Sequence, residues 1–227
     1  MLIMTLLMLG TDPDTVTPKP QRSAVVSALF VNEGEGFVPV KSNEPLQALL
    51  AQKPELDFFE TAAVGNAADL RRQLDSDASR IKSRNSFGWT ALHMASFAGN
   101  VANVKLLLDR GADVNVRAET KFHNTPLQAA LLTGEYDAAK VLLEHGADAL
   151  VRQNKGFTPM HEAAFMGRID IIQLLLDHGA ELNSRSDDGR SPMSEAMRHN
   201  KKDAVEFLKS KGAIDFPQAG KSSSDPD

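Results

Sequence analysis

The chain of 227 residues contains no cysteine, one tryptophan and one tyrosine. Without cysteine it can form no disulfide bond, no thiolate metal site and no cysteine nucleophile, which fits a reducing compartment. No apolar run approaches the ~20 residues that a membrane-spanning helix needs. The net charge of -5 gives no overall attraction to nucleic acid. A share of 42% hydrophobic residues suits a globular core.

Catalytic motifs are missing as well. The sequence has no phosphate-binding loop, no nucleophile elbow and no constellation of paired carboxylates. Asp187-Asp188-Gly189 resembles the start of a calcium loop, but the alternating ligands and the closing glutamate of such loops are absent. A turn is the better interpretation of this stretch. We therefore expect no enzyme activity, no catalytic residue, no cofactor and no metal ion.

What the sequence does contain is a recurring four-residue motif. Its copies start at residues 90, 125, 158 and 191, so the intervals are 35, 33 and 33 residues. The copies are Thr90-Ala91-Leu92-His93, Thr125-Pro126-Leu127-Gln128, Thr158-Pro159-Met160-His161 and Ser191-Pro192-Met193-Ser194. A leucine-rich stretch follows each copy and ends in Gly-Ala, as in Leu175-Leu176-Asp177-His178-Gly179-Ala180. A period in this range indicates a repeat architecture.

One copy shows why the pattern predicts two helices. Thr158 is a suitable helix cap, and Pro159 sits at the first helical position, where its missing N–H costs nothing. Gly167 ends this helix, and a second apolar stripe at helical spacing runs on to Gly179. Two short antiparallel helices cannot bury their own apolar face, so each unit needs copies of itself on either side.

This period and these motifs resemble the ankyrin repeat over about residues 56–216. The resemblance implies an all-α ankyrin-repeat solenoid of helix-turn-helix repeats with β-hairpin-like fingers, comprising about five repeats plus a degenerate N-terminal cap. It places the repeats at about 56–84, 85–117, 120–152, 153–185 and 186–216. The first helix of the first repeat aligns with the second repeat at an offset of 34 residues, so the first repeat lacks the Thr-Pro-Leu-His start.

The two ends of the chain differ from the repeats. Residues 1–22 begin with an apolar run but lack the preceding positive charge and the prompt cleavage site of a signal peptide, so we expect a disordered segment with a weak signal-like run. Residues 23–55 are expected to form degenerate capping helices, since terminal repeats are commonly atypical. The polar tail, 217–227, is expected to be disordered.

Histidine occupies the fourth motif position in two repeats, as His93 and His161. The resemblance implies a structural role, in which each imidazole ties a helix to a finger. A metal site would need three or four converging ligands, whereas the remaining histidines recur about one repeat apart.

Large and basic side chains at finger and inner-helix positions predict where a partner binds. For Trp89 and Phe157, packing on the neighbouring repeat is an equal alternative, because large aromatics usually bury most of their surface. For the other aromatic residues we favour binding, because an exposed apolar stripe usually marks an interaction site. The predicted partner-binding residues are Phe87, Trp89, Phe97, Lys121, Phe122, His123, Leu132, Lys155, Phe157, Phe165, Arg190 and Arg198.

The finger between the second and third motifs is two residues longer than the others, and the extra residues are most simply placed at Ala118-Glu119. At its turn His123 stands where the other fingers have glycine. The insertion is expected to relieve the need for a positive φ there and to carry Lys121 and Phe122 beyond the neighbouring fingers. A tolerated loop insertion without a role is the alternative.

The fingers together carry a charge of +4, and the rest of the chain carries -9. Basic fingers on an acidic body favour a partner protein with an acidic rim around an apolar patch. We expect a monomeric, non-enzymatic protein-protein interaction module (adaptor, scaffold or inhibitor) that binds through the concave face and the finger tips, with no small-molecule substrate and no membrane span. The alternative is a nucleic-acid-binding or regulatory solenoid that uses the basic fingers. The expected location is cytoplasmic, or secreted or periplasmic if residues 1–22 act as a signal.

Overall fold

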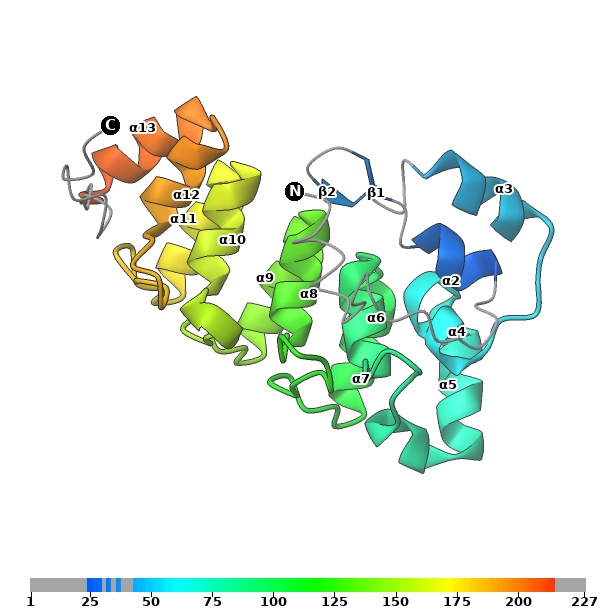
Figure 1. The fold of residues 1–227 in the computed structure, drawn as a ribbon. Coiled ribbons are helices and arrows are strands. Elements are labelled where there is room, and N and C mark those ends of the chain that lie inside the picture. The colour runs from blue at the N-terminus through cyan, green and yellow to red at the C-terminus, as the bar shows by residue number, and fades with distance from the viewer. Residues whose placement is uncertain (1–23, 30–31, 34–35, 38–42, 215–227) are drawn as a thin grey trace. The chain divides into compact units, whose positions relative to one another are not determined.

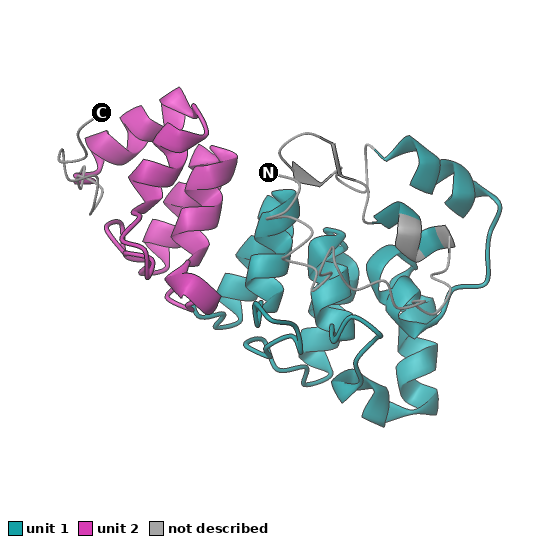
Figure 2. Cartoon of the chain, in the orientation of Figure 1, with its two compact units in different colours: residues 1–148 teal, residues 149–227 magenta. Residues whose placement is uncertain are grey.

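The computed structural model describes residues 24–29, 32–33, 36–37 and 43–214. The expected disordered segments, 1–22 and 217–227, therefore lie outside the described residues. The chain divides into two compact units, residues 1–148 (unit 1) and residues 149–227 (unit 2), which Figure 2 distinguishes by colour. Each unit is considered by itself.

Helix pairs make up most of both units (Figure 1). In unit 1 the pairs are α4 (Phe58–Val64) with α5 (Ala67–Ser76), α6 (Ala91–Phe97) with α7 (Val101–Asp109), and α8 (Pro126–Thr133) with α9 (Tyr136–Glu144). In unit 2 they are α10 (Pro159–Met166) with α11 (Ile169–Asp177), and α12 (Pro192–Arg198) with α13 (Lys202–Ser210). The 3-10 turns η2 (Ala78–Lys82) and η3 (Asn154–Gly156) lie in the connections. The all-α repeat fold is as the sequence predicts.

The first helices of successive pairs lie side by side within each unit, and we call them the inner helices. In unit 1 these are α4, α6 and α8, and in unit 2 they are α10 and α12. Small residues at their centres, such as Ala95 and Ala130, are fully buried and let neighbouring helices approach closely. The core of each unit therefore runs along the stack from repeat to repeat.

Each inner helix begins with a reciprocal capping box, which satisfies backbone N–H groups at both ends of the box. Thr90 with His93 and Thr158 with His161 form two of them. In the first repeat Asp57 caps α4 and Glu60 completes the box. The first repeat thus has its own helix start, 33 residues before Thr90, and the offset of 34 expected for this helix is wrong by one residue. The intervening turn of the first repeat is shorter, so the offset reaches 34 only at the cap of the next helix, Asn66.

Polar side chains join the first two repeats across their helices. The Asn103 side chain, which is fully buried, donates to the carbonyl oxygen of Thr61 at 2.9 Å, and Asn100 donates to that of Gly65 at 2.9 Å. These carbonyls belong to the last turn of α4 and its cap, which have no partner within the helix. The contact between the two repeats is therefore directional as well as apolar.

Residues 24–51 form a separate helical segment, called here the N-terminal segment. It contains α2 (Ala24–Leu29) and α3 (Glu44–Ala51), with a two-residue strand pair, β1 (Asn32–Glu33) and β2 (Gly36–Phe37), between them. Its buried side chains Val25, Leu29 and Leu46 belong to one hydrophobic cluster with residues of the first three repeats. The expected capping role of this region stays a prediction.

Candidate protein-binding surface

The fingers are tight turns closed by one backbone hydrogen bond. The N–H of Asn85 donates to the carbonyl oxygen of Trp89 at 2.9 Å, and that of Gln153 donates to Phe157 at 2.8 Å. In the longer finger the N–H of Ala118 donates to the carbonyl oxygen of Asn124 at 2.8 Å. The closing pair is two residues further apart there, so the extra residues lie within 119–123.

The longer finger does not present its aromatic residue to solvent. Phe122 is 7% exposed, and the Lys121 ammonium lies 5.4 Å from the centre of its ring. His123 adopts φ = 53°, so the insertion leaves the demand for a left-handed residue in place. The expectations of an exposed Phe122 and of a relieved turn are both wrong. Lys121 and His123 themselves are exposed.

Successive fingers are joined by backbone and arginine hydrogen bonds. The N–H of Glu119 donates to the carbonyl oxygen of Gly88 at 2.9 Å, and the N–H of Asp187 donates to that of Lys155 at 2.8 Å. Arg84 bridges the carbonyl oxygens of Gly88 and Arg117 and pairs with Glu119. In unit 2, Arg152 likewise donates to the Arg185 carbonyl oxygen and to Asp187. Much of the positive charge of the fingers is thus used inside the fingers.

The two motif histidines tie each capping box to the next finger. The Nε2 atoms of His93 and His161 lie 2.9 and 3.0 Å from the carbonyl oxygens of Asn124 and Arg190. Because a carbonyl oxygen only accepts, each Nε2 carries the proton, and each Nδ1 accepts from the threonine of the box. Burial lowers the pKa of both imidazoles to about 4. The neutral rings are structural, as the resemblance implies.

Four of the predicted partner-binding aromatics are buried. Trp89, Phe97, Phe122 and Phe157 are 0, 1, 7 and 5% exposed. Trp89 packs edge-on against Phe97, and Phe157 lies between His161 and the Arg190 guanidinium, 4.6 Å from its ring centre. For Trp89 and Phe157 this is the packing alternative. The expectation that Phe97 is exposed is wrong, and its cover is described below.

The remaining predicted residues keep some exposure. Lys155 and Arg198 are exposed, whereas Phe87, Leu132, Phe165 and Arg190 are partly buried. Arg190 has its guanidinium on Asp188 and Glu195, the latter at 3.0 Å, so it supports the last finger. Leu132 and Phe87 pack against the hydrophobic cluster of unit 1.

The apolar surface that stays open in unit 2 lies at the ends of its inner helices. The rings of Phe165 on α10 and His199, which caps α12, meet edge to face with 4.3 Å between their centres. Met197 beside them is 47% exposed, and Arg198 follows it. We call Phe165, Met197, Arg198 and His199 the inner-helix surface of unit 2. Comparison of equivalent positions found Phe165 and Arg198 but missed Met197, which a search for exposed apolar neighbours in the last turn of α12 would have found.

Two buried carboxylates lie at equivalent positions in unit 2. Glu195 pairs with Arg190, whereas Glu162 accepts only from the Gln153 amide, and its Oε2 atom has no partner among the described residues. Burial raises the pKa of Glu162 well above its usual range. Neither carboxylate has a second acid and an open cleft beside it, as general acid–base chemistry would need.

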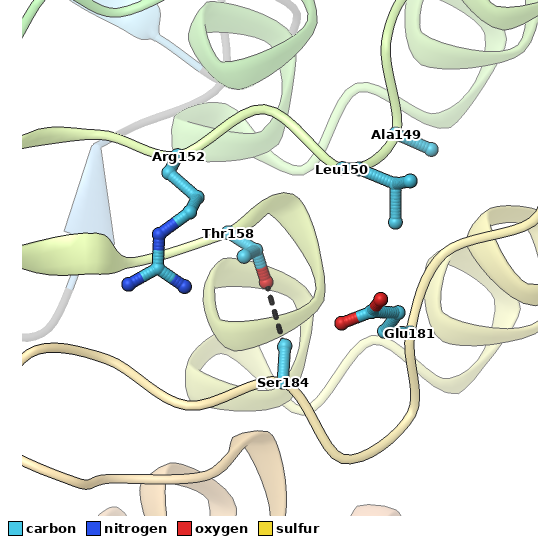
Figure 3. Close-up of a pocket in the computed structure, with 6 residues that line it drawn as sticks. All are labelled: Ala149, Leu150, Arg152, Thr158, Glu181 and Ser184. Carbon is cyan, nitrogen blue, oxygen red and sulfur yellow. Dashed lines mark hydrogen bonds between the residues drawn. The ribbon is translucent and has the colours of Figure 1, made fainter.

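A cavity of about 240 Å³ lies beside the finger bases of unit 2 (Figure 3). Its walls are Ala149, Leu150, Arg152, Thr158, Glu181 and Ser184. The Thr158 and Ser184 hydroxyls are 3.1 Å apart in its wall, and Arg152 is already bonded to the next finger. Within the part of the chain that the structure describes, no group of three or more potential ligands could hold a metal ion, and no helix is long and apolar enough to cross a membrane.

Comparison with known proteins agrees with this architecture. The family model described as ankyrin repeats (3 copies) matches residues 58–153 and 148–218. The E3 ubiquitin-protein ligase MIB2 of Gallus gallus is 40% identical over 78 residues. That alignment covers 33% of this chain but 8% of the chicken protein.

Proposed function

The chain belongs to the ankyrin repeat family, and from that premise we propose that it is a non-enzymatic module that binds another protein. Ankyrin repeats generally mediate protein-protein interaction, and the scaffold here is built for the same task. The single observation that carries the proposal is the inner-helix surface of unit 2, where Met197 is 47% exposed beside the half-buried Phe165. Exposed apolar residues that adjoin one another on a folded protein are typical of an interaction site.

The charge next to this surface indicates the kind of partner. Arg198 is exposed in the last turn of α12, and Lys155 is exposed in a finger of the same unit. We propose a partner with an apolar patch for Phe165 and Met197 and an acidic rim for Arg198. Charges at the rim of an interface act mainly on association rate and specificity.

Nucleic acid is the less favoured ligand. The finger arginines that would have to meet phosphates are bonded to finger carbonyl oxygens and carboxylates, as Arg84 and Arg152 show. Phosphate binding would require these bonds to be exchanged. The ligase activity of the chicken relative carries no weight here, because the alignment spans 8% of that protein. We place the protein in the cytoplasm, which sequencing of its mature N-terminus would test.

Site-specific photo-crosslinking in the source cells tests the proposal. A photo-reactive amino acid replaces Met197 in the full chain, and a second variant carries it at Lys209, an exposed position on α13. We expect a discrete adduct from position 197 that protease removes and nuclease leaves intact, and no such adduct from position 209. Nuclease-sensitive adducts would favour the nucleic-acid function instead. Equal adducts from both positions would contradict a binding surface at Met197.

A further inference from the structure

The seventh residue after each helix cap forms a row across the inner helices. In unit 1 this row consists of Val64, Phe97 and Leu132, and in unit 2 the same position holds Phe165 and Arg198. The row of unit 1 is entirely apolar, and we call it the unit 1 row. A row of this kind would normally be an open interaction surface.

The N-terminal segment occupies the unit 1 row. Phe97 is 1% exposed, although its counterpart Phe165 in unit 2 is only half-buried. Val25, Leu29 and Leu46 share a hydrophobic cluster with Phe97, and Val64 and Leu132 pack against that cluster. The strand β2 of the segment lies next to α8, which carries Leu132. The segment therefore reaches the third repeat, further than a cap that stacked only on the first repeat would reach.

The segment is organised as a unit of its own. The Asn43 side chain, 1% exposed, donates to the Ala28 carbonyl oxygen at 2.7 Å and accepts from the Leu46 N–H at 3.0 Å. One residue thus caps α3 and ties it to α2. These two bonds stay inside the segment, whereas Asn103 and His93 make theirs from repeat to repeat.

The contact between the segment and the repeats has the chemistry of helix-in-groove recognition. Val25 and Leu29 are four residues apart and lie on one face of α2, and Leu46, Leu49 and Leu50 give α3 a similar face. Apolar contact is not directional, so another helix with aliphatic residues at this spacing can make an equivalent contact.

We propose that the unit 1 row is a second protein-binding site, filled in the free protein by its own N-terminal segment. The ligand that it accepts is a partner's amphipathic helix with aliphatic side chains at positions i and i+4. Such a helix binds by displacing α2 and α3, so the segment lowers the apparent affinity of the row for every competitor. This inference goes beyond the surface proposed for unit 2 and stands whichever ligand binds there.

Competition by the segment's own sequence tests the proposal on the full chain. The probe is a fluorescein-labelled synthetic peptide of residues 23–52, and a scrambled peptide is its control. Leu46→Asp weakens the resident segment by placing a charge in the cluster. We expect this variant to bind the peptide at least about 10-fold more tightly than the wild type, because a tethered competitor acts at an effective concentration of order mM.

Two further substitutions in the Leu46→Asp background locate the binding. Leu132→Glu, at a partly exposed position of the row, should lower the peptide affinity at least about 10-fold, and Met197→Glu in unit 2 should leave it unchanged. Trp89 is the sole tryptophan and lies fully buried in the same cluster, so Leu46→Asp should increase its quenching by acrylamide and the peptide should reverse that increase. Binding that ignores Leu132→Glu, or no peptide binding by a folded Leu46→Asp chain, overturns the proposal.

Hydrogen exchange of the wild type decides the matter if Leu46→Asp fails to fold. Displacement requires that the segment opens while the repeats stay folded. We expect the amides of α3 to exchange at least about 100-fold faster than those of α6, relative to their intrinsic rates. Equal protection of α3 and α6 would show that the segment belongs to the same cooperative unit as the repeats and would overturn the proposal.

Discussion

The imidazole of His161 donates from Nε2 to the carbonyl oxygen of Arg190 at 3.0 Å, 29 residues along the chain. The same ring accepts from the Thr158 N–H through Nδ1, at 3.2 Å. One neutral tautomer therefore completes a helix cap in one repeat and holds the finger of the next. Protonation of Nδ1 would remove the acceptor that the cap needs.

This relationship predicts a loss of stability in mild acid. The pKa of His93 and of His161 is lowered to about 4, whereas an unfolded imidazole titrates near 6.5. Their contribution is fully present above about pH 6.5 and is lost as the pH falls towards 4, because the unfolded chain binds the protons first. We expect His161→Gln to reduce the slope of unfolding free energy against pH by up to about 1.4 kcal/mol per pH unit in this window. Urea unfolding at a series of pH values measures the slope.

His178→Gln provides the control for this experiment. His178 is exposed and its Nδ1 lies 2.9 Å from the Leu174 carbonyl oxygen of the same helix. Its replacement should leave the slope nearly unchanged. A slope that responds equally to both substitutions would mean that the buried imidazole of His161 is not the titrating group.

A second prediction concerns the unpaired carboxylate in unit 2. Because burial raises the pKa of Glu162, the unfolded state releases its proton more readily, and stability falls as the pH rises above about 4.5. Glu162→Gln keeps an oxygen for the Gln153 amide and removes the titration. We expect the free energy of unfolding at pH 7 to rise by roughly 1 kcal/mol, the scale of an uncompensated buried polar group. The gain should shrink as the pH approaches 4.5.

The equivalent change at Glu195 should have the opposite sign. Its carboxylate pairs with Arg190 at 3.0 Å, so Glu195→Gln leaves a guanidinium without its partner and should destabilise the chain. If urea melts show that Glu162→Gln is destabilising too, then the Glu162 carboxylate is compensated in solution and its assigned penalty is incorrect.

The long finger gives a third prediction. His123 holds a left-handed conformation at φ = 53° and its side chain is exposed. His123→Gly should therefore raise the free energy of unfolding by up to about 1 kcal/mol, because glycine enters this region without the Cβ penalty. Thermal or urea unfolding can detect a change of this size.

Gly88→Ala is the matched change in the preceding finger. A Cβ at Gly88, where φ is 76°, would lie 2.5 Å from the backbone oxygen of Glu119, so we expect a clear loss of stability. If His123→Gly destabilises as well, the His123 side chain makes a favourable contact that outweighs its backbone strain.

The repeat architecture was predictable because its causes are local. Caps such as Thr158, helix ends such as Gly167 and the leucine stripes recur at a fixed period, and each acts over one or two turns of chain. The first repeat could have been read in the same way, since Asp57 and Glu60 match the Asp-x-x-Glu form of a capping box.

The candidate site was less predictable because exposure depends on distant parts of the chain. Phe97 and Phe165 occupy the same position in their repeats, yet the N-terminal segment covers the first and not the second. Nothing in the repeat pattern specifies where residues 24–51 pack. The finger insertion was misplaced for a similar reason, since only the hydrogen bond from Ala118 to Asn124 shows which residues lie within the loop.

The most direct test of the proposed function is the affinity of the full chain for the crosslinked partner, measured by isothermal titration calorimetry. Met197→Ala should weaken binding at least about 10-fold by removing an apolar contact at the centre of the interface. Arg198→Glu should weaken it further at low salt, whereas Lys209→Glu, the same charge reversal on α13, should leave it unchanged. Affinities that are equal for the wild type, Met197→Ala and Arg198→Glu would contradict binding through the inner-helix surface of unit 2.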